Sequence, residues 1–255
     1  MYLPDITPEY IEVFGFPVSQ TLITSLVATV FFVLFVVLYN LLKSKNPKNK
    51  FVVGVDMFVE LVLDFFENIG GTLHPIAKNY VIFVFFYLLW VNLFGVLGDV
   101  FAIVIPAVHE WFRPVATDIY FNAILAVLGV VGSLIYGFKM NGFHYIEKFV
   151  PYKGMGLVDK VDSVGKFFVK IADIAIGLFV GVLEMISEVA KILSLTLRLF
   201  GNIFAGVILL TLSITALPVL FPVLVIVFEI AVSFIQAFVF ALLVCIYFKM
   251  AESVH

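Results

Sequence analysis

The chain has 255 residues, of which 63% are hydrophobic and 13% are charged, with a net charge of −3. A soluble domain is about half apolar and about a quarter charged, so this composition excludes an ordinary globular protein and indicates a surface that mostly faces lipid. One cysteine excludes an internal disulfide and a cysteine-based metal site. The sequence contains neither a nucleotide-binding loop nor the basic stripe of a nucleic-acid-binding protein.

The N-terminal third predicts an outer arm, one membrane span and a surface helix. Residues 1–17 are polar and acidic, and residues 18–42 form an apolar run long enough to cross a bilayer, which takes about 20 residues. After a basic loop at 43–50, the acidic residues of 51–73 recur at helical spacing, which predicts an amphipathic helix with one acidic face. Those acidic residues are Asp56, Glu60, Asp64 and Glu67.

The rest of the chain predicts two further spans and a helical hairpin. Residues 79–100 and 118–138 are apolar, and 166–249 contains proline only at 218 and 222. The uninterrupted part of that last segment reads as a helix of about 70 Å, more than twice the ~30 Å hydrocarbon core, so it must tilt or lie partly in the membrane plane. We expect a single-domain, all-α integral membrane protein with about five membrane-associated helices, ending in a long tilted helical hairpin.

The distribution of lysines predicts the orientation. If the N-terminus is outside, every lysine except Lys191 falls at the cytoplasmic side, as cytoplasmic loops favour. The C-terminus is then cytoplasmic. We expect a multi-pass protein of the cell (inner) membrane, with an organellar inner membrane as the alternative.

Polar residues inside the last two helices are the candidate functional residues. A charged side chain in the middle of a membrane helix costs about 2.5–3.5 kcal/mol on insertion scales, so it persists where it lines a polar path or finds a partner. At about 100° per residue, one stripe of the long helix and one face of the final helix are polar. The stripe holds Glu184, Glu188, Lys191, Ser194, Arg198 and Asn202, and the face holds Glu229, Ser233 and Gln236.

Structural explanations compete with a path for several of these residues. Lys191 can form an ion pair with Glu188, three residues earlier, and Ser194 and Ser233 can donate to carbonyls of their own helices. Arg198 differs, because no carboxylate stands three or four residues from it. Its permanent charge therefore needs compensation from outside its own turn.

The residues around Arg198 resemble a known family. The run 194–206, SLTLRLFGNIFAG, is similar to the signature of subunit a of F-type ATP synthases, and 236–241, QAFVFA, resembles its second signature. The patterns at 92–95, NLFG, and 113–118, RPVATD, are also similar to that family. The resemblance covers nearly the whole chain from the first span onward.

The resemblance implies a role for each polar residue. Arg198 matches the essential arginine that faces the carboxylates of the rotating c-ring, with Gln236 opposite it and Asn202 one turn away. Glu184, Lys191 and Ser194 match positions of the cytoplasmic access path, and Glu229 matches a position of the opposite path. Glu188 is expected on the cytoplasmic path from its spacing before Arg198 on the same stripe, and Ser233, on the face of Glu229, is a further candidate for the proton path. Many relatives have an acid or histidine where this chain has Val207, so Glu229 is expected to serve that path alone.

The implied function is that of a proton-translocating stator subunit. Two aqueous half-channels would deliver and remove protons at the c-ring, with the arginine between them, and the chain would have no catalytic site and no cofactor of its own. Its partners would be the c-ring, the peripheral-stalk b subunits, the rest of the F-type ATP synthase and membrane lipid. A secondary transporter remains an alternative, although no internal repeats are visible. The polar stripe of the long helix and the polar face of the final helix can meet in one polar seam. A purely structural membrane protein would not need that seam.

Overall fold

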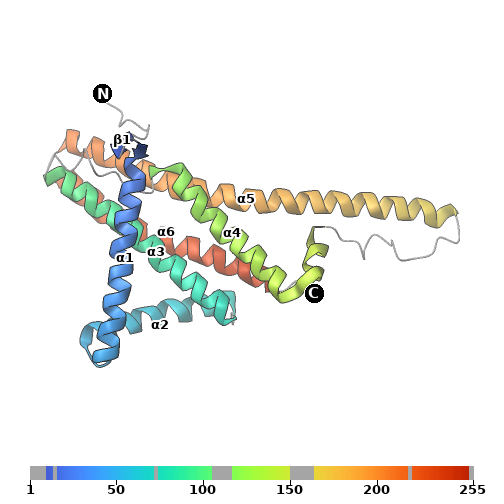
Figure 1. The fold of residues 1–255 in the computed structure, drawn as a ribbon. Helices are drawn as coiled ribbons and strands as arrows, with labels where there is room; N and C mark the ends of the chain where they lie inside the picture. The colour runs from blue at the N-terminus through green and yellow to red at the C-terminus, as the bar shows by residue number, and fades with distance from the viewer. Residues whose placement is uncertain are drawn as a thin grey trace.

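The computed structural model describes residues 10–13, 16–71, 74–104, 117–149, 164–217 and 220–252. Arg113 and residues 1–9 of the expected outer arm lie outside these ranges. Figure 1 shows a helical protein with one small pair of strands at its N-terminal end. The elements are β1 (Tyr10–Val13), β2 (Phe16–Ser19), α1 (Gln20–Lys45), α2 (Lys50–Gly70), α3 (Pro75–Val104), α4 (Ile119–Asn141), the 3₁₀ helix η3 (Gly142–Lys148), α5 (Val164–Ala216) and α6 (Leu220–Glu252).

The expected all-α membrane fold is confirmed. Among the described residues, five helices are long and apolar enough to cross a membrane, namely α1, α3, α4, α5 and α6. The remaining long helix, α2, runs across the base of the molecule at a steep angle to α1 (Figure 1). It occupies the segment for which the acidic periodicity predicts an amphipathic surface helix.

The two strands were not predicted from the sequence. β1 and β2 pair antiparallel, with Tyr10 opposite Ser19 and Val13 opposite Phe16. The acidic residues of this segment suggested a polar arm, but aromatic and β-branched residues alternate with them, and those residues favour strands. The side chain of Ser19 then accepts a hydrogen bond from the Leu22 amide at 3.3 Å, which caps α1 and sets its first residue.

Ion pairs hold α2 at both of its ends. Lys43 of α1 pairs with Asp56 at 2.7 Å, and the Tyr39 hydroxyl donates to the same carboxylate. The hydrogen bond from the Lys43 ammonium has the largest effect in holding the pKa of Asp56 below its ordinary value, and the hydrogen bond from the Tyr39 hydroxyl has the next largest. Near the other end, Glu67 pairs with Lys78 of α3 at 2.5 Å. Part of the acidic face therefore joins α2 to its neighbours.

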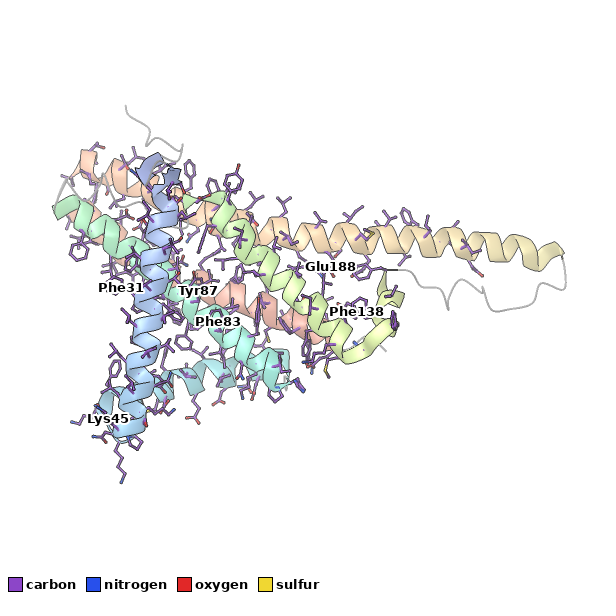
Figure 2. The ribbon with its side chains drawn as sticks, in the orientation of Figure 1. Phe31, Lys45, Phe83, Tyr87, Phe138 and Glu188 are labelled. Atoms are coloured by element: carbon purple, nitrogen blue, oxygen red, sulfur yellow. The ribbon has the colours of Figure 1, made fainter. Side chains whose placement is uncertain are left out.

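Aromatic side chains fill the contact between α1 and α3. Phe83 and Tyr87 lie on one face of α3 (Figure 2), and their rings stack with centroids 5.8 Å apart. Phe32 of α1 meets Tyr87 edge-on, with ring centroids 5.6 Å apart. The indole nitrogen of Trp90 donates to the Ala28 carbonyl at 3.0 Å. These contacts anchor α1 to the rest of the bundle through shape and dispersion.

Small residues let α6 pass through the centre of the bundle. It packs against α2, α3, α4 and α5, and Ala237 and Ala241 are fully buried on it. A side chain at Gly129 of α4 would meet Val244 at 3.0 Å. Helices in membranes approach closely where small residues lie between them, so α6 can touch all four neighbours.

The longest helix, α5, extends far beyond the rest of the molecule (Figure 1). Its 53 residues span about 80 Å at 1.5 Å per residue. Its C-terminal part packs on α4 and α6. The projecting part exposes large apolar side chains such as Ile176, Leu178 and Phe179, which suits lipid or a partner chain.

The bundle has two ends, which we name after the acidic residue whose hydrogen bonds define each of them. At the first, the Asp118 end, the Thr21 hydroxyl of α1 donates to Asp118 at 2.9 Å. At the second, the Glu252 end, the Tyr136 hydroxyl of α4 donates to Glu252 at 2.7 Å, and Asn141 donates to the Ala251 carbonyl at 2.7 Å. The starts of α1, α4 and α6 therefore lie at the Asp118 end. The end of α3 lies there too, because the His74 amide just before α3 donates to Glu252. So does the end of α5, because α5 runs antiparallel to α6.

Candidate functional site

The polar residues of α5 and α6 face each other across an antiparallel contact. Lys191 lies over the ring of Tyr247, with its ammonium 5.0 Å from the ring centroid. At the other end of the contact, a Cβ on Gly206 would lie 2.5 Å from an oxygen of Glu229. Arg198 lies between Lys191 and Gly206 on α5. Gln236 lies between Glu229 and Tyr247 on α6, so Arg198 and Gln236 both lie within this contact.

Glu188 and Lys191 form an ion pair. Their side chains meet at 2.8 Å, and Glu188 is only 7% exposed. The pairing that the sequence left as one of two readings is therefore present, and the aromatic face of Tyr247 adds a cation–π contact to the lysine. Glu184 lies one turn before Glu188 on α5 and is half-buried.

Arg198 has no such partner. It is half-buried beside the fully buried Leu195 and Leu199. Within the described residues, no carboxylate forms an ion pair with it, whereas Lys43, Lys78, Lys191 and Lys249 all have one. A guanidinium cannot shed its charge at neutral pH, so this side chain keeps a full unpaired charge on the α5 surface.

Several hydroxyl and amide groups of the seam have spare hydrogen-bonding capacity. In the part of the chain that the structure describes, neither Ser194 nor Ser233 donates to its own helix, although Thr196 and Ser213 do. Gln236 is 8% exposed, and its amide nitrogen has no partner among the described atoms. Buried polar groups normally find a partner, so these groups are available to water or to another chain.

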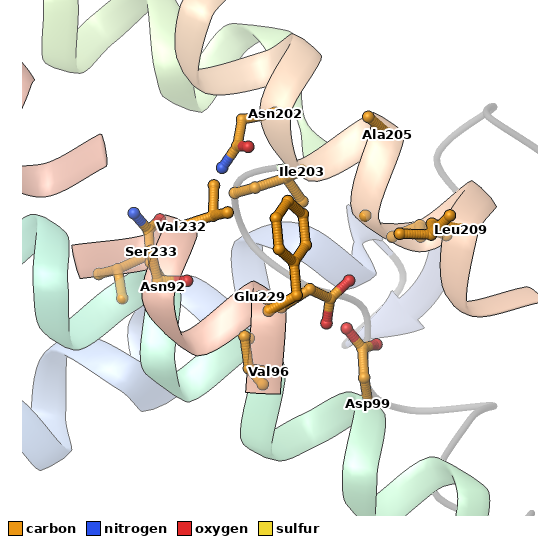
Figure 3. Close-up of a pocket in the computed structure, with 15 residues that line it drawn as sticks. Asn92, Val96, Asp99, Asn202, Ile203, Ala205, Leu209, Glu229, Val232 and Ser233 are labelled. Carbon is orange, nitrogen blue, oxygen red and sulfur yellow. The ribbon is translucent and has the colours of Figure 1, made fainter. Parts of the chain in front are cut away.

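A cavity of about 320 Å³ opens between α3, α5 and α6. Figure 3 shows its wall, where polar side chains from all three helices meet. The polar lining residues are Asn92, Asp99, Asn202, Glu229 and Ser233. The cavity starts in the Asp118 half of the bundle and reaches Asn202, one turn of α5 from Arg198.

Asp99 is the cavity residue that the sequence analysis missed. Its carboxylate and that of Glu229 point towards each other (Figure 3). A signal was present, since Asn92, Gly95, Val96 and Asp99 recur at i, i+3, i+4 and i+7 and so share one face of α3. Asp99 lies close to the end of that helix, where an acidic residue is easily taken for part of a loop.

The cavity wall also contains Val207 of α5. This is the position at which the resemblance leads us to expect an acid or a histidine, so α5 contributes no titratable group to the cavity. Among the described residues, no group of three or more His, Cys, Asp or Glu side chains is arranged to hold a metal ion. The chemistry available in the cavity is that of two carboxylates, two amides and one hydroxyl.

Comparison with known proteins gives a consistent assignment. A family model described as ATP synthase A chain matches residues 21–249. ATP synthase subunit a of Priestia megaterium is 31% identical, covering 93% of this chain and 93% of that protein. ATP synthase subunit a of Pelagibacter ubique is 31% identical over 74% of this chain and 70% of its own length, and that of Trichlorobacter lovleyi is 28% identical over 77% and 73%.

Proposed function

This chain belongs to the ATP synthase A chain family, and on that premise we propose that it is the stator subunit that carries protons past a rotating c-ring. The observation that carries the proposal is Arg198, a half-buried arginine with no ion-pair partner in the described part of the chain. An arginine held in that state by its own subunit suits a partner that comes and goes. A passing carboxylate on the ring is such a partner.

The arginine supplies the electrostatic step. A ring carboxylate enters lipid only in its protonated form, because a bare charge in hydrocarbon is costly. Opposite Arg198 the ionised carboxylate is stabilised by the positive charge, so it releases its proton there. Gln236 lies in the same contact of α5 with α6, and its unpaired amide nitrogen offers a donor to the same carboxylate.

Two access paths meet at the arginine. From the Asp118 end, the cavity lined by Glu229, Ser233 and Asn202 leads towards it. From the other direction, Glu184, Glu188, Lys191 and Ser194 follow the same stripe of α5. The fixed charge between the paths repels a proton that would cross directly, so net flow requires the ring to turn.

The remaining assignments follow from the same premise. The chain itself contributes no ATP chemistry, which belongs to other subunits of the synthase, and it contacts the c-ring and the peripheral-stalk b subunits. It lies in the cell (inner) membrane, with the Asp118 end outside and the Glu252 end in the cytoplasm. The lysines near the ends of α1, α3, α4 and α6 support this orientation, since all of them lie away from the Asp118 end.

Replacement of Arg198 tests the proposal. We expect the Arg198→Ala complex to assemble, to lose ATP synthesis, and to leak protons, because the ring carboxylate no longer ionises at the interface and the barrier between the paths falls. Arg198→Lys keeps part of the barrier but changes reach and geometry, so synthesis stays mostly lost. The measurements are ATP synthesis and passive proton flux in vesicles matched for subunit content.

Lys45→Ala is the matched control, because Lys45 is an exposed cation at the end of α1 (Figure 2). We expect it to behave as the unmodified protein in both assays. Normal ATP synthesis in a fully assembled Arg198→Ala complex would reject the proposed function. A structural arginine would instead show as loss of the subunit from the membrane.

A further inference from the structure

The cavity between α3, α5 and α6 contains a second carboxylate that the proposed function does not use. Asp99 reaches the cavity from α3 and Glu229 reaches it from α6, and Figure 3 shows the two groups facing each other. They are 130 positions apart in the sequence. Glu229 and Asp99 are the only titratable side chains among the described residues that line this cavity.

An independent observation shows that the cavity is built for a polar guest. Asn92 is 3% exposed and lines the cavity, and neither its amide nitrogen nor its amide oxygen has a partner in the described structure. One oxygen of Glu229 is likewise without a partner there. Burying such groups unpaired costs free energy, and the volume of about 320 Å³ has room for several water molecules. The wall therefore suits a chain of water linking the carboxylates.

Two residues of α5 lie next to the carboxylate pair, and they explain why the second carboxylate comes from α3. Val207 has no group that can carry a proton, although it lines the same cavity. Gly206, next to it, leaves the space that the Glu229 carboxylate occupies, since a Cβ there would lie 2.5 Å from its oxygen. At these two positions α5 thus provides room and an apolar surface, and the titratable groups of the cavity come from α3 and α6.

Two carboxylates that face each other in a largely apolar wall repel when both are ionised, so one shared proton stabilises the pair. Resting on the proposed function, we infer that Asp99 is a second proton-carrying residue of the path at the Asp118 end and passes its proton to Glu229. In this step an O–H bond on Asp99 breaks as one forms on Glu229, directly or through one water. The total charge of the pair stays the same.

The order of the two residues follows from their places along the helices. Asp99 lies five residues before the end of α3, about 7 Å along its axis, whereas Glu229 lies nine residues into α6, about 13 Å. Asp99 is therefore nearer the Asp118 end, and Glu229 is nearer Arg198. A proton taken up at that end reaches Asp99 first, then Glu229, and then the ring carboxylate beside Asn202 and Arg198.

The test uses the complete ATP synthase in sealed vesicles, with ATP-driven proton pumping as the readout at matched subunit content. The variants are Asp99→Asn, Glu229→Gln, the double variant, and Asp99→Asn combined with Val207→Asp, which moves the carboxylate from α3 to α5 within the same cavity. Asp64→Asn is the matched control, because Asp64 is an exposed carboxylate on α2. Arg198→Ala is measured in parallel.

We expect Asp99→Asn to slow pumping on the order of 10²-fold, the lower end of what a positioned proton-transfer group contributes. The double variant is expected to be no slower than the slower single variant, because the two residues act in one sequence of transfers. The relocated carboxylate is expected to restore part of the rate. Asp64→Asn is expected to leave the rate unchanged.

Three results would overturn the inference. An Asp99→Asn rate equal to that of Asp64→Asn, with Arg198→Ala still uncoupled, removes Asp99 from the path and leaves the proposed function intact. A double variant slowed by the product of the single effects shows two independent roles. If the Asp99→Asn, Val207→Asp complex assembles but recovers none of the pumping rate, Asp99 has a structural role. Failure of Asp99→Asn alone to assemble would strengthen that assignment.

Discussion

Gly206 shows how a single residue controls the position of a functional side chain. A Cβ at this position would lie 2.5 Å from an oxygen of Glu229 and 3.3 Å from its carboxyl carbon. Side-chain carbons do not approach oxygen so closely, so one of the two groups must move. The end of the glutamate side chain is flexible and the helix backbone is not. The carboxylate is therefore the group that shifts.

Gly206→Ala is thus expected to slow ATP-driven proton pumping while the subunit stays in the complex. Glu229 would be pushed away from the cavity, and a proton-transfer group that moves by about 1 Å can lose on the order of 10² in rate. Gly54→Ala is the control, since nothing lies within 4 Å of a Cβ at that helical glycine. Equal pumping rates for the two variants would show that the Glu229 position is not critical.

The charged residues of α5 differ in what their own subunit provides for them. Lys191 has both Glu188 and the face of Tyr247. Removing one member of such a largely buried pair costs about 3–5 kcal/mol, because the other charge is left uncompensated. Arg198, two turns further along, lacks an equivalent partner among the described residues. The same helix therefore carries one cation that is neutralised locally and one without an ion-pair partner in the described part of the chain.

At the scale of whole elements, the last turn of α6 joins three helices. Glu252 accepts hydrogen bonds from the Tyr136 hydroxyl of α4 at 2.7 Å, from Lys249 at 3.1 Å, and from the His74 amide just before α3 at 3.3 Å. The adjacent carbonyl of Ala251 accepts from Asn141. One carboxylate thus fixes how the ends of α3, α4 and α6 meet.

Glu252→Ala is expected to destabilise the Glu252 end by about 1–2 kcal/mol. Each hydrogen bond contributes roughly 0.5–1.5 kcal/mol net, and partial exposure of the carboxylate reduces the ionic part. The measurement is the midpoint of thermal unfolding of the detergent-solubilised complex, compared with Glu60→Ala on the exposed face of α2. Identical midpoints would mean that the contacts of α6 along its length already hold this end.

For the whole molecule, the arrangement of the helices makes the proposed orientation testable at two positions. Lys48 lies in the loop between α1 and α2, at the end of α1 that is away from the Asp118 end, and Leu217 follows α5 at the Asp118 end. We expect a membrane-impermeant thiol reagent to label Lys48→Cys only from the cytoplasmic side and Leu217→Cys only from the outside. Sealed vesicles of the two orientations provide the two sides.

The natural Cys245 is a built-in control for that experiment, because it is fully buried and gives no label in the folded protein. Labelling of Lys48→Cys from the outside would reverse the proposed topology. It would also exchange the two ends of the proton path. Labelling of both positions from one side would contradict the helical arrangement itself.

Local patterns in the sequence determined the membrane class, the five long apolar helices and the polar stripe around Arg198. Length and apolar composition define a span residue by residue, and helical periodicity places Glu188, Lys191 and Arg198 on one face before any neighbour is known. The absence of a carboxylate one turn from Arg198 is also visible in the sequence. These properties depend only on residues close together in the chain.

Contacts between distant segments were decided by the tertiary structure alone. Two examples are the meeting of Asp99 with Glu229 and the contacts of Glu252. Both depend on how helices cross and rotate against one another. Periodicity along one helix does not encode its rotation about a neighbour. That rotation is set by close packing of small and large side chains across the whole bundle, as at Gly129 and Val244. For this reason the presence of Asp99 in the cavity that Val207 lines became visible only in the folded chain.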